Sequence, residues 1–198
     1  MKTITFFIVI FILTTLLGFS QGTLDSGLVA YYPFSGNAND SSANAYHGTV
    51  NGATLTTDRF GQPNAAYSFN GSGDNITLAN SSNLNITNQL SISVWVKTTN
   101  PGHGQNIIGS SSYLDRSYIL NINGSDGQIE FAVAKSVPNL WDAFIESQDS
   151  ITDNIWHHIV GIFQGADLKL YADTKSTGVV FGSSFLDVTN ISNILIVP

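Results

Sequence analysis

The chain has 198 residues, a formal net charge of −7 at pH 7 and no cysteine. An excess of acidic groups does not neutralise phosphates, which argues against nucleic acids and anionic membrane surfaces as partners. Without cysteine there is no disulfide framework, so the burial of apolar side chains must stabilise the fold. A chain of this length can form one all-β domain with a sizeable core.

The N-terminus has the pattern of a secretion signal. A basic residue is followed by an apolar run over residues 4–17 and then by small residues. This run is shorter than the roughly 20 residues that span a bilayer, which predicts a cleaved signal rather than a membrane anchor. No later apolar run reaches transmembrane length. We therefore expect residues 1–20 to be a signal peptide, residues 21–198 to form the mature domain, and the protein to be secreted, either extracellular or on the cell surface.

Strand patterns follow one another along the rest of the chain. Residues 90–97 alternate apolar and polar side chains, which predicts a strand with one buried face. Residues 155–164 are apolar on both faces, which predicts a central strand covered on two sides. Further short strands are expected at residues 29–32, 48–55, 66–69, 75–78, 107–110, 118–122, 129–133, 168–172 and 194–197.

The segments between these strands carry turn residues. Asn-Gly or Asp-Gly pairs begin at Asn51, Asn70, Asn123 and Asp126, and these residue types accept positive φ at low cost. No stretch after the signal has a helical period. Many short strands with such turns predict an all-β fold, an antiparallel β-sandwich or jelly roll.

Two blocks of the sequence resemble a known family. The first is residues 28–71, LVAYYPFSGNANDSSANAYHGTVNGATLTTDRFGQPNAAYSFNG, in which aromatic strand patches alternate with turns. The second is WHHIVG at residues 156–161, followed by LKLYAD at residues 168–173. In this order the blocks resemble the laminin G-like domains of the concanavalin A-like lectin-glucanase family. The resemblance implies a concanavalin A-like sandwich that lacks its final strand in this chain, and thus a C-terminally incomplete domain.

Catalytic patterns are not found in the sequence. The glucanase branch of the resembled family uses two carboxyls about 5–5.5 Å apart, and it places them on one strand with an alternating Glu-x-Asp pattern. Glu130 and Glu146 each stand alone among apolar or amide neighbours, and no Gly-x-Ser-x-Gly motif marks a nucleophile. We therefore expect the protein not to be an enzyme.

Metal binding has one candidate loop. His157 and His158 are adjacent on a strand and point to opposite faces, which favours histidines that are hydrogen-bonded within the sandwich over a zinc site. Residues 37–44, which include Asp40, offer the oxygen ligands that calcium prefers. The resemblance implies a calcium ion near this loop, with Asp74 as a second carboxylate. An equal alternative is that both aspartates only form Asx turns.

Two clusters in loops carry candidate ligand-binding side chains. Trp141 and Asp142 form the first cluster, and Tyr113, Asp115 and Arg116 form the second. An aromatic ring can stack on the apolar face of a sugar while charged and polar groups bind its hydroxyls. The alternative for each aromatic ring is a place in the core.

Together these features predict a secreted, non-catalytic, lectin-like module that binds a polysaccharide or glycan, with Ca²⁺ as a candidate cofactor. One alternative is an extracellular protein-interaction or adhesion domain whose partner is another extracellular protein. Another is the accessory domain of an exported glycoside hydrolase. All three functions can use the same sandwich, so they have to be distinguished by the residues and geometry of the site.

Overall fold

The computed structural model describes residues 27–78, 84, 89–99, 102–109, 118–133, 143–165, 167–173 and 175–181, with residues 177–181 described by their backbone alone. The regular structure in these residues is almost entirely antiparallel strand, which confirms the predicted fold class. Among the described residues, no helix is long and apolar enough to cross a membrane.

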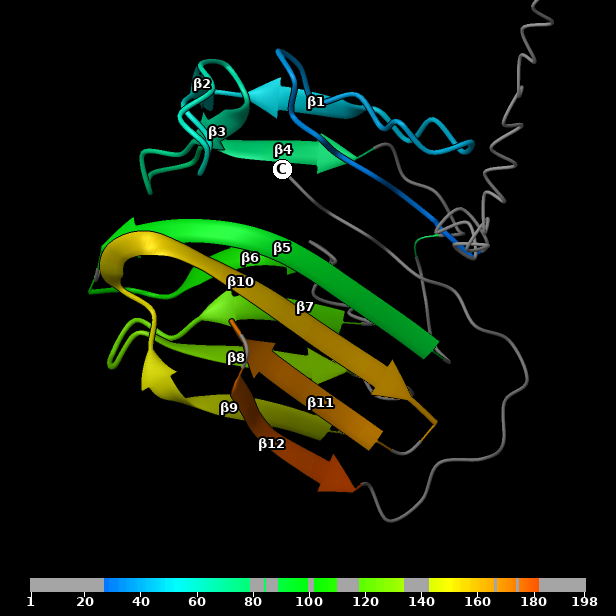
Figure 1. Cartoon of the computed structure of the whole chain (residues 1–198), viewed down its shortest axis with the longest axis vertical. Helices are drawn as coiled ribbons and strands as arrows, with labels where there is room; N and C mark the ends of the chain where they lie inside the picture. Colours follow the sequence, from blue (N-terminus) through cyan, green and yellow to red (C-terminus); the bar gives the residue numbers. More distant parts are fainter. Residues whose placement is uncertain are drawn as a thin grey trace, which may run out of the picture.

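Two four-stranded sheets face each other (Figure 1). The front sheet has the order β12-β11-β10-β5 and consists of β5 (Gln89–Thr99), β10 (Asp153–Gln164), β11 (Asp167–Ala172) and β12 (Lys175–Phe181). The back sheet has the order β6-β7-β8-β9 and consists of β6 (Gln105–Gly109), β7 (Tyr118–Ile122), β8 (Gln128–Val133) and β9 (Ala143–Ser150). Two ribbons lie beyond β5 in Figure 1: β1 (Gly48–Asn51) with β4 (Asn75–Leu78), and β2 (Thr54–Thr56) with β3 (Ala66–Ser68).

The core lies between the two sheets. In β5 the predicted apolar face is buried, with Leu90, Ile92 and Val94 at most 6% exposed. From the back sheet, the ring of Phe131 in β8 packs against Gly161 of β10, where an added Cβ would lie 3.1 Å from the ring. The small residue therefore lets the sheets approach closely at this point.

β10 lies between β5 and β11, which confirms that it is a central strand. Its inner face is buried from His157 to Phe163, whereas Ile155 is exposed. Its outer side chains are only half-buried: Trp156, His158, Val160 and Ile162. The expectation of cover on both faces is therefore wrong. Part of the outer face of the front sheet is covered by the loop between β2 and β3, since Arg59 of that loop lies over Trp95 and Trp95 stacks on His158.

Two predicted strands differ from the structure for local reasons. Residues 29–32 do not form a strand, because the N–H of Tyr31 donates to the carboxylate of Asp40 instead of to a neighbouring strand. The strand expected at residues 48–55 is divided into β1 and β2, since Gly52 turns the chain with a φ of 80°.

Strand β9 has no counterpart among the predicted strands. Its buried side consists of Ala143, Ile145 and Ser147, so the apolar pattern is short. The hydroxyl of Ser147 accepts the N–H of Ile129 at 2.9 Å and donates to the carbonyl of Asp149 at 2.7 Å, which allows a polar residue to occupy a buried position. The strand expected at residues 194–197 lies outside the described residues.

Candidate functional site

The five predicted ligand residues lie outside the described residues: Trp141, Asp142, Tyr113, Asp115 and Arg116. The described residues that flank their two loops are nevertheless neighbours at one end of the back sheet. Tyr118, the first residue of β7, lies opposite Val133, the last residue of β8, and Val133 lies opposite Ala143, the first residue of β9. Gly109, the last residue of β6, pairs with the second residue of β7. The role of the five residues in binding stays a prediction.

Asp40 is a buried hydrogen-bond acceptor in the loop before β1, with an exposed fraction of 5%. Its Oδ1 accepts the N–H groups of Tyr31 and Ser42, both at 2.8 Å. Its Oδ2 accepts the hydroxyl of Ser42 at 2.8 Å and the N–H of Tyr46 at 2.9 Å. Burial alone would raise the pKa of Asp40, but these hydrogen bonds outweigh it and hold the pKa below its ordinary value. Asp40 therefore ties three points of the loop together.

Asp74 also accepts a local hydrogen bond. Its Oδ2 accepts the N–H of Asn70 at 2.9 Å, while its Oδ1 occupies the space that a Cβ at Gly52 would need. Calcium would need the carboxylate lone pairs that four donors already take at Asp40. Within the described ranges, no group of three or more histidine, cysteine or acidic side chains is arranged for a metal ion. The contact of Asp40 with the N–H of Ser42 fits an Asx turn, whereas Asp74 accepts the N–H of a residue four positions before it, and calcium binding stays a prediction.

His157 is clamped between two carboxylates on the inner face of β10. Its Nδ1 lies 3.0 Å from Oδ2 of Asp173, and its Nε2 lies 2.9 Å from Oδ1 of Asp153. Burial by itself lowers the pKa of His157, but the two carboxylates outweigh it and hold the pKa above its ordinary value. The protonated ring donates from both nitrogens, so it connects the beginning of β10 with the turn between β11 and β12.

We expect this clamp to make stability depend on pH. Because folding raises the pKa of His157, its contribution is complete below about pH 6.5 and is lost as the pH rises through the raised value. Against the effect of burial, hydrogen bonds from the N–H of His158 and from the ring of His157 lower the pKa of Asp173, so its contribution is lost in acid. Asp173→Asn should lower the free energy of unfolding by about 1 kcal/mol at pH 5.5 and by less at pH 8.5.

Urea denaturation at the two pH values measures this difference. The expected change in the free energy of unfolding is small because about half of the Asp173 side chain is exposed, so water screens its interactions. Asp149→Asn is the matched control, since the pair of Asp149 with Lys175 at 3.6 Å is exposed and contributes little at either pH. An equal effect of Asp173→Asn at both pH values would contradict the conclusion that protonated His157 stabilises the fold through Asp173.

His158 points to the outer face, opposite to His157, as predicted. Its ring stacks on Trp95 with centroids 4.9 Å apart, and its Nε2 lies 2.8 Å from the hydroxyl of Ser93. The guanidinium of Arg59, from the loop between β2 and β3, lies 4.5 Å from the ring centroid of Trp95 and 4.1 Å from that of Phe60. Burial and then the charge of Arg59 hold the pKa of His158 below its ordinary value. This stack anchors the β2–β3 loop on β5.

Two carboxylates that are distant in the sequence meet on the outer face of the back sheet. Glu130 of β8 lies directly opposite Glu146 of β9, and Asn121 of β7 lies opposite Glu130. Burial and then the charge of Glu146 raise the pKa of Glu130. Each glutamate has apolar or amide neighbours in the sequence, but strand pairing brings the two together, although no spacing along the chain relates them.

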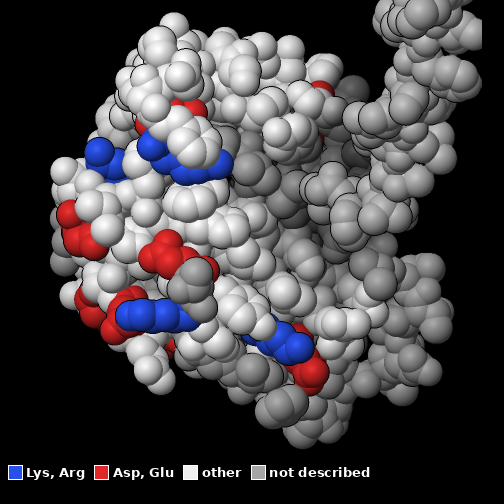
Figure 2. All heavy atoms as spheres, viewed as in Figure 1, with Lys and Arg blue, Asp and Glu red and all other residues white. Residues whose placement is uncertain are grey.

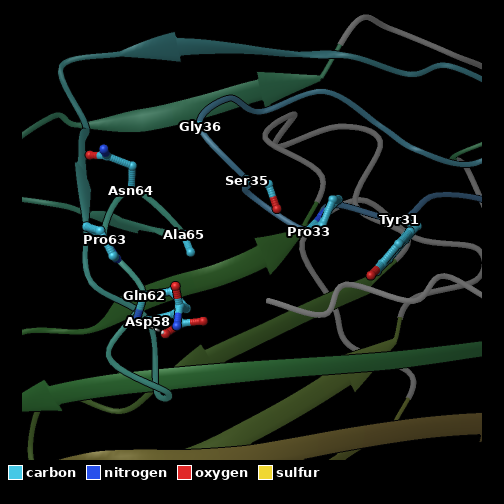
Figure 3. A pocket seen from close by; sticks show the side chains of 9 residues that line it. All are labelled: Tyr31, Pro33, Ser35, Gly36, Asp58, Gln62, Pro63, Asn64 and Ala65. Carbon is cyan, nitrogen blue, oxygen red and sulfur yellow. Dashed lines mark hydrogen bonds between the residues drawn. The ribbon is translucent and has the colours of Figure 1, made fainter.

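A hollow of about 530 Å³ opens beside the β2–β3 loop (Figure 3). It is lined by Tyr31, Pro33, Ser35, Gly36, Asp58, Gln62, Pro63, Asn64 and Ala65. Five of these residues are exposed and the other four are partly buried, so the hollow is shallow. No motif marks these residues in the sequence, since they come from two loops that are rich in turn residues and amides.

The surface of the front sheet carries charges of both signs. Figure 2 shows acidic and basic side chains interspersed over this face, with the basic ones close to acidic ones in several places. The exposed pair of Lys175 with Asp149 is one such case. Charges of both signs therefore lie close together on this face.

Two antiparallel four-stranded sheets packed face to face define the class of β-sandwich domains. The chain belongs to the concanavalin A-like lectin/glucanases superfamily, whose family model matches residues 70–196. This confirms the family resemblance, and the match includes the second sequence block but only the last two residues of the first. The superfamily is named for both binding proteins and enzymes, so membership defines the type of domain and leaves the ligand to the site.

One solved structure is similar to this chain. It is the S-layer domain-containing protein (residues 221–444) from Clostridium thermocellum ATCC 27405, with 21% sequence identity and a TM-score of 0.41. The similarity covers 77% of this chain and 72% of that chain. No curated protein matches the chain.

Proposed function

We propose that this protein is a secreted, non-catalytic module that binds a polysaccharide or glycan outside the cell or at its surface. Membership of the concanavalin A-like lectin/glucanases superfamily supports a domain of the carbohydrate-binding type. The observation that carries the proposal is the position of the loop ends: Tyr118, Val133 and Ala143 are neighbours in the back sheet. Both loops with candidate ligand residues therefore start and finish at one end of the sandwich, where they can contribute to one site.

In this proposal the ring of Trp141 stacks on the apolar face of a sugar, and Asp142 accepts hydrogen bonds from its hydroxyls. Tyr113, Asp115 and Arg116, from the other loop, contact the next sugar unit. Such a site needs no nucleophile and no acid–base pair. It holds the glycan in place without cleaving it.

A glycan array followed by retention on the immobilised polysaccharide tests the proposal. Trp141→Ala should weaken retention about tenfold or more, because loss of a central aromatic contact commonly costs over 1 kcal/mol. Phe69→Ala is the matched control, since Phe69 is an aromatic residue with 50% exposure outside the proposed site. Circular dichroism checks that both variants fold. An array with no bound glycan would contradict carbohydrate binding and favour the protein-interaction alternative.

The same retention experiment tests the predicted cofactor and the absence of catalysis. Retention that is lost in EDTA and restored by CaCl₂ would support calcium, and the ion should also raise the melting temperature by binding the native state. If neither EDTA nor CaCl₂ changes the retention or the melting temperature, calcium binding is contradicted. Release of reducing sugar from the bound polysaccharide, abolished by Glu130→Gln, would contradict a non-catalytic module.

A further inference from the structure

We propose that the hollow beside the β2–β3 loop is a second saccharide-binding site, specific for chains of neutral hexoses. This inference rests on the proposed function, because it assumes that the domain binds carbohydrate. The residues that line this site are different from the candidate ligand residues of the two loops at the end of the back sheet, and all of them are described.

The lining side chains form two facing walls (Figure 3). Tyr31 and Pro33 form one wall, and Pro63 and Asn64 form the opposite wall. Asp58 and Gln62 lie on the side of the β2–β3 loop. Its volume of about 530 Å³ falls within the range of ligand pockets, and its shallow, open form suits a segment of a longer chain.

Hydrogen bonds hold the lining in shape before any ligand binds. Oδ1 of Asp58 accepts the N–H groups of Phe60 and Gln62, both at 2.8 Å, and the N–H of Asp58 donates to the carbonyl of Gln62 at 3.0 Å. The two walls are joined by the N–H of Gly36, which donates to the carbonyl of Asn64 at 2.8 Å. A preformed lining reduces the conformational entropy that binding costs.

Side chains of the front sheet also hold the β2–β3 loop in place. The guanidinium of Arg59 lies over the ring of Trp95, which itself stacks on His158. Arg59 directly follows Asp58 in the chain, so this contact fixes the backbone that carries the lining residue. Arg59 is therefore a positioning residue for the hollow and not part of its lining.

The polar side chains in the hollow are available to a ligand. In the part of the chain that the structure describes, the side chains of Gln62 and Asn64 and the phenol of Tyr31 make no hydrogen bond within the protein. An amide offers both donors and an acceptor, which matches sugar hydroxyls, since these also donate and accept. The Tyr31 ring and the two prolines supply the apolar surface that the C–H face of a pyranose covers.

The charge of the lining selects neutral sugars. Its one ionisable carboxylate is that of Asp58, and no lysine or arginine is among the nine lining residues. An anionic sugar would face this carboxylate without a compensating cation, and the whole chain carries an acidic excess as well. Neutral hexose chains avoid this repulsion, while uronic acid chains do not.

An NMR titration of the ¹⁵N-labelled secreted chain with cellohexaose, laminarihexaose and mannohexaose tests the site. Saturable shifts of the amide signals of residues 31–36 and 58–65 are expected with at least one of the three. Tyr31→Ala should weaken that binding about tenfold and Gln62→Ala about fivefold. Phe144→Ala, an aromatic residue with 54% exposure on the back sheet, should leave it unchanged.

The outcomes separate this site from the proposed function. Shifts confined to residues 110–117 and 134–142, or binding that Gln62→Ala leaves unchanged, would overturn the hollow and leave carbohydrate binding intact. Gln62 is exposed, so its substitution keeps the test valid if Tyr31→Ala fails to fold. Binding of polygalacturonate as tight as that of the neutral hexasaccharides would overturn the neutral specificity. No shift with any of these sugars would overturn the site.

Discussion

Asp40→Ala is expected to lower the free energy of unfolding by about 3 to 5 kcal/mol at pH 7, because three N–H groups and one hydroxyl lose their acceptor together. The donors are Tyr31, Ser42 and Tyr46, and the carboxylate that they share is buried. Little water reaches a group with 5% exposure, so hydration replaces these hydrogen bonds only in part. The loss releases the segment that carries Tyr31 from the loop before β1.

Urea denaturation at pH 7 and pH 3 measures this effect and its pH dependence. The pKa of Asp40 is lowered in the folded state, so its stabilising contribution is present above about pH 3.9 and is lost as the pH falls through the lowered value. The difference between the native protein and Asp40→Ala should therefore shrink in strong acid. Asp126→Ala is the matched control, since Asp126 is exposed and accepts one N–H, that of Gln128. An equal cost for both substitutions would contradict the structural role of Asp40.

Phe131→Ala is expected to cost about 3 to 5 kcal/mol, the usual range for removing a buried aromatic ring from a core. Phe131 is fully buried, and its ring fills the space above Gly161 where the two sheets approach. No flexible side chain at Gly161 can move into the cavity that the substitution leaves. Phe144→Ala is the control in the adjacent strand, because Phe144 points outward with 54% exposure and should cost far less.

The contact between Phe131 and Gly161 can be tested from both sides. Gly161→Ala places a Cβ 3.1 Å from the ring, so it should cost about 1 to 3 kcal/mol by overpacking. Combined with Phe131→Leu, the added methyl meets a smaller side chain, and the cost of the pair should be less than the sum of the single costs. Additive costs in urea denaturation would show that the two residues are not in contact.

The two proposed sites, in the hollow and in the loops at the end of the back sheet, differ in the chemistry that they would offer to a glycan. The loop residues combine aromatic rings with charged side chains, whereas the hollow combines Tyr31 and two prolines with amides. Two weak sites on one chain can bind a polymer more tightly than either alone, if its length spans both. Measuring the retention of Trp141→Ala, Gln62→Ala and the double variant on the immobilised polysaccharide compares the contributions of the two proposed sites.

The fold class could be read from local patterns in the sequence. The alternation at residues 90–97 predicted which face of β5 is buried, and turn residues predicted many of the strand boundaries. Side chains alternate along any strand, so this information is contained within a few consecutive residues. Strand β9 was not predicted, because Ser147 interrupts the apolar side of its pattern. The hydrogen bonds of the Ser147 hydroxyl explain how this polar residue can be buried.

The chemistry of the surface depended on the folded chain. The opposition of Glu130 and Glu146, the clamp on His157 and the two walls of the hollow each join residues from separate strands or loops. The N–H of Ser42 donates to Asp40 as in the Asx turn that the sequence allowed, whereas those of Tyr31 and Tyr46 reach it only because the chain folds back on itself. A local pattern records which face of a strand is apolar, but the register between strands decides which side chains meet, and register is a property of the whole sheet.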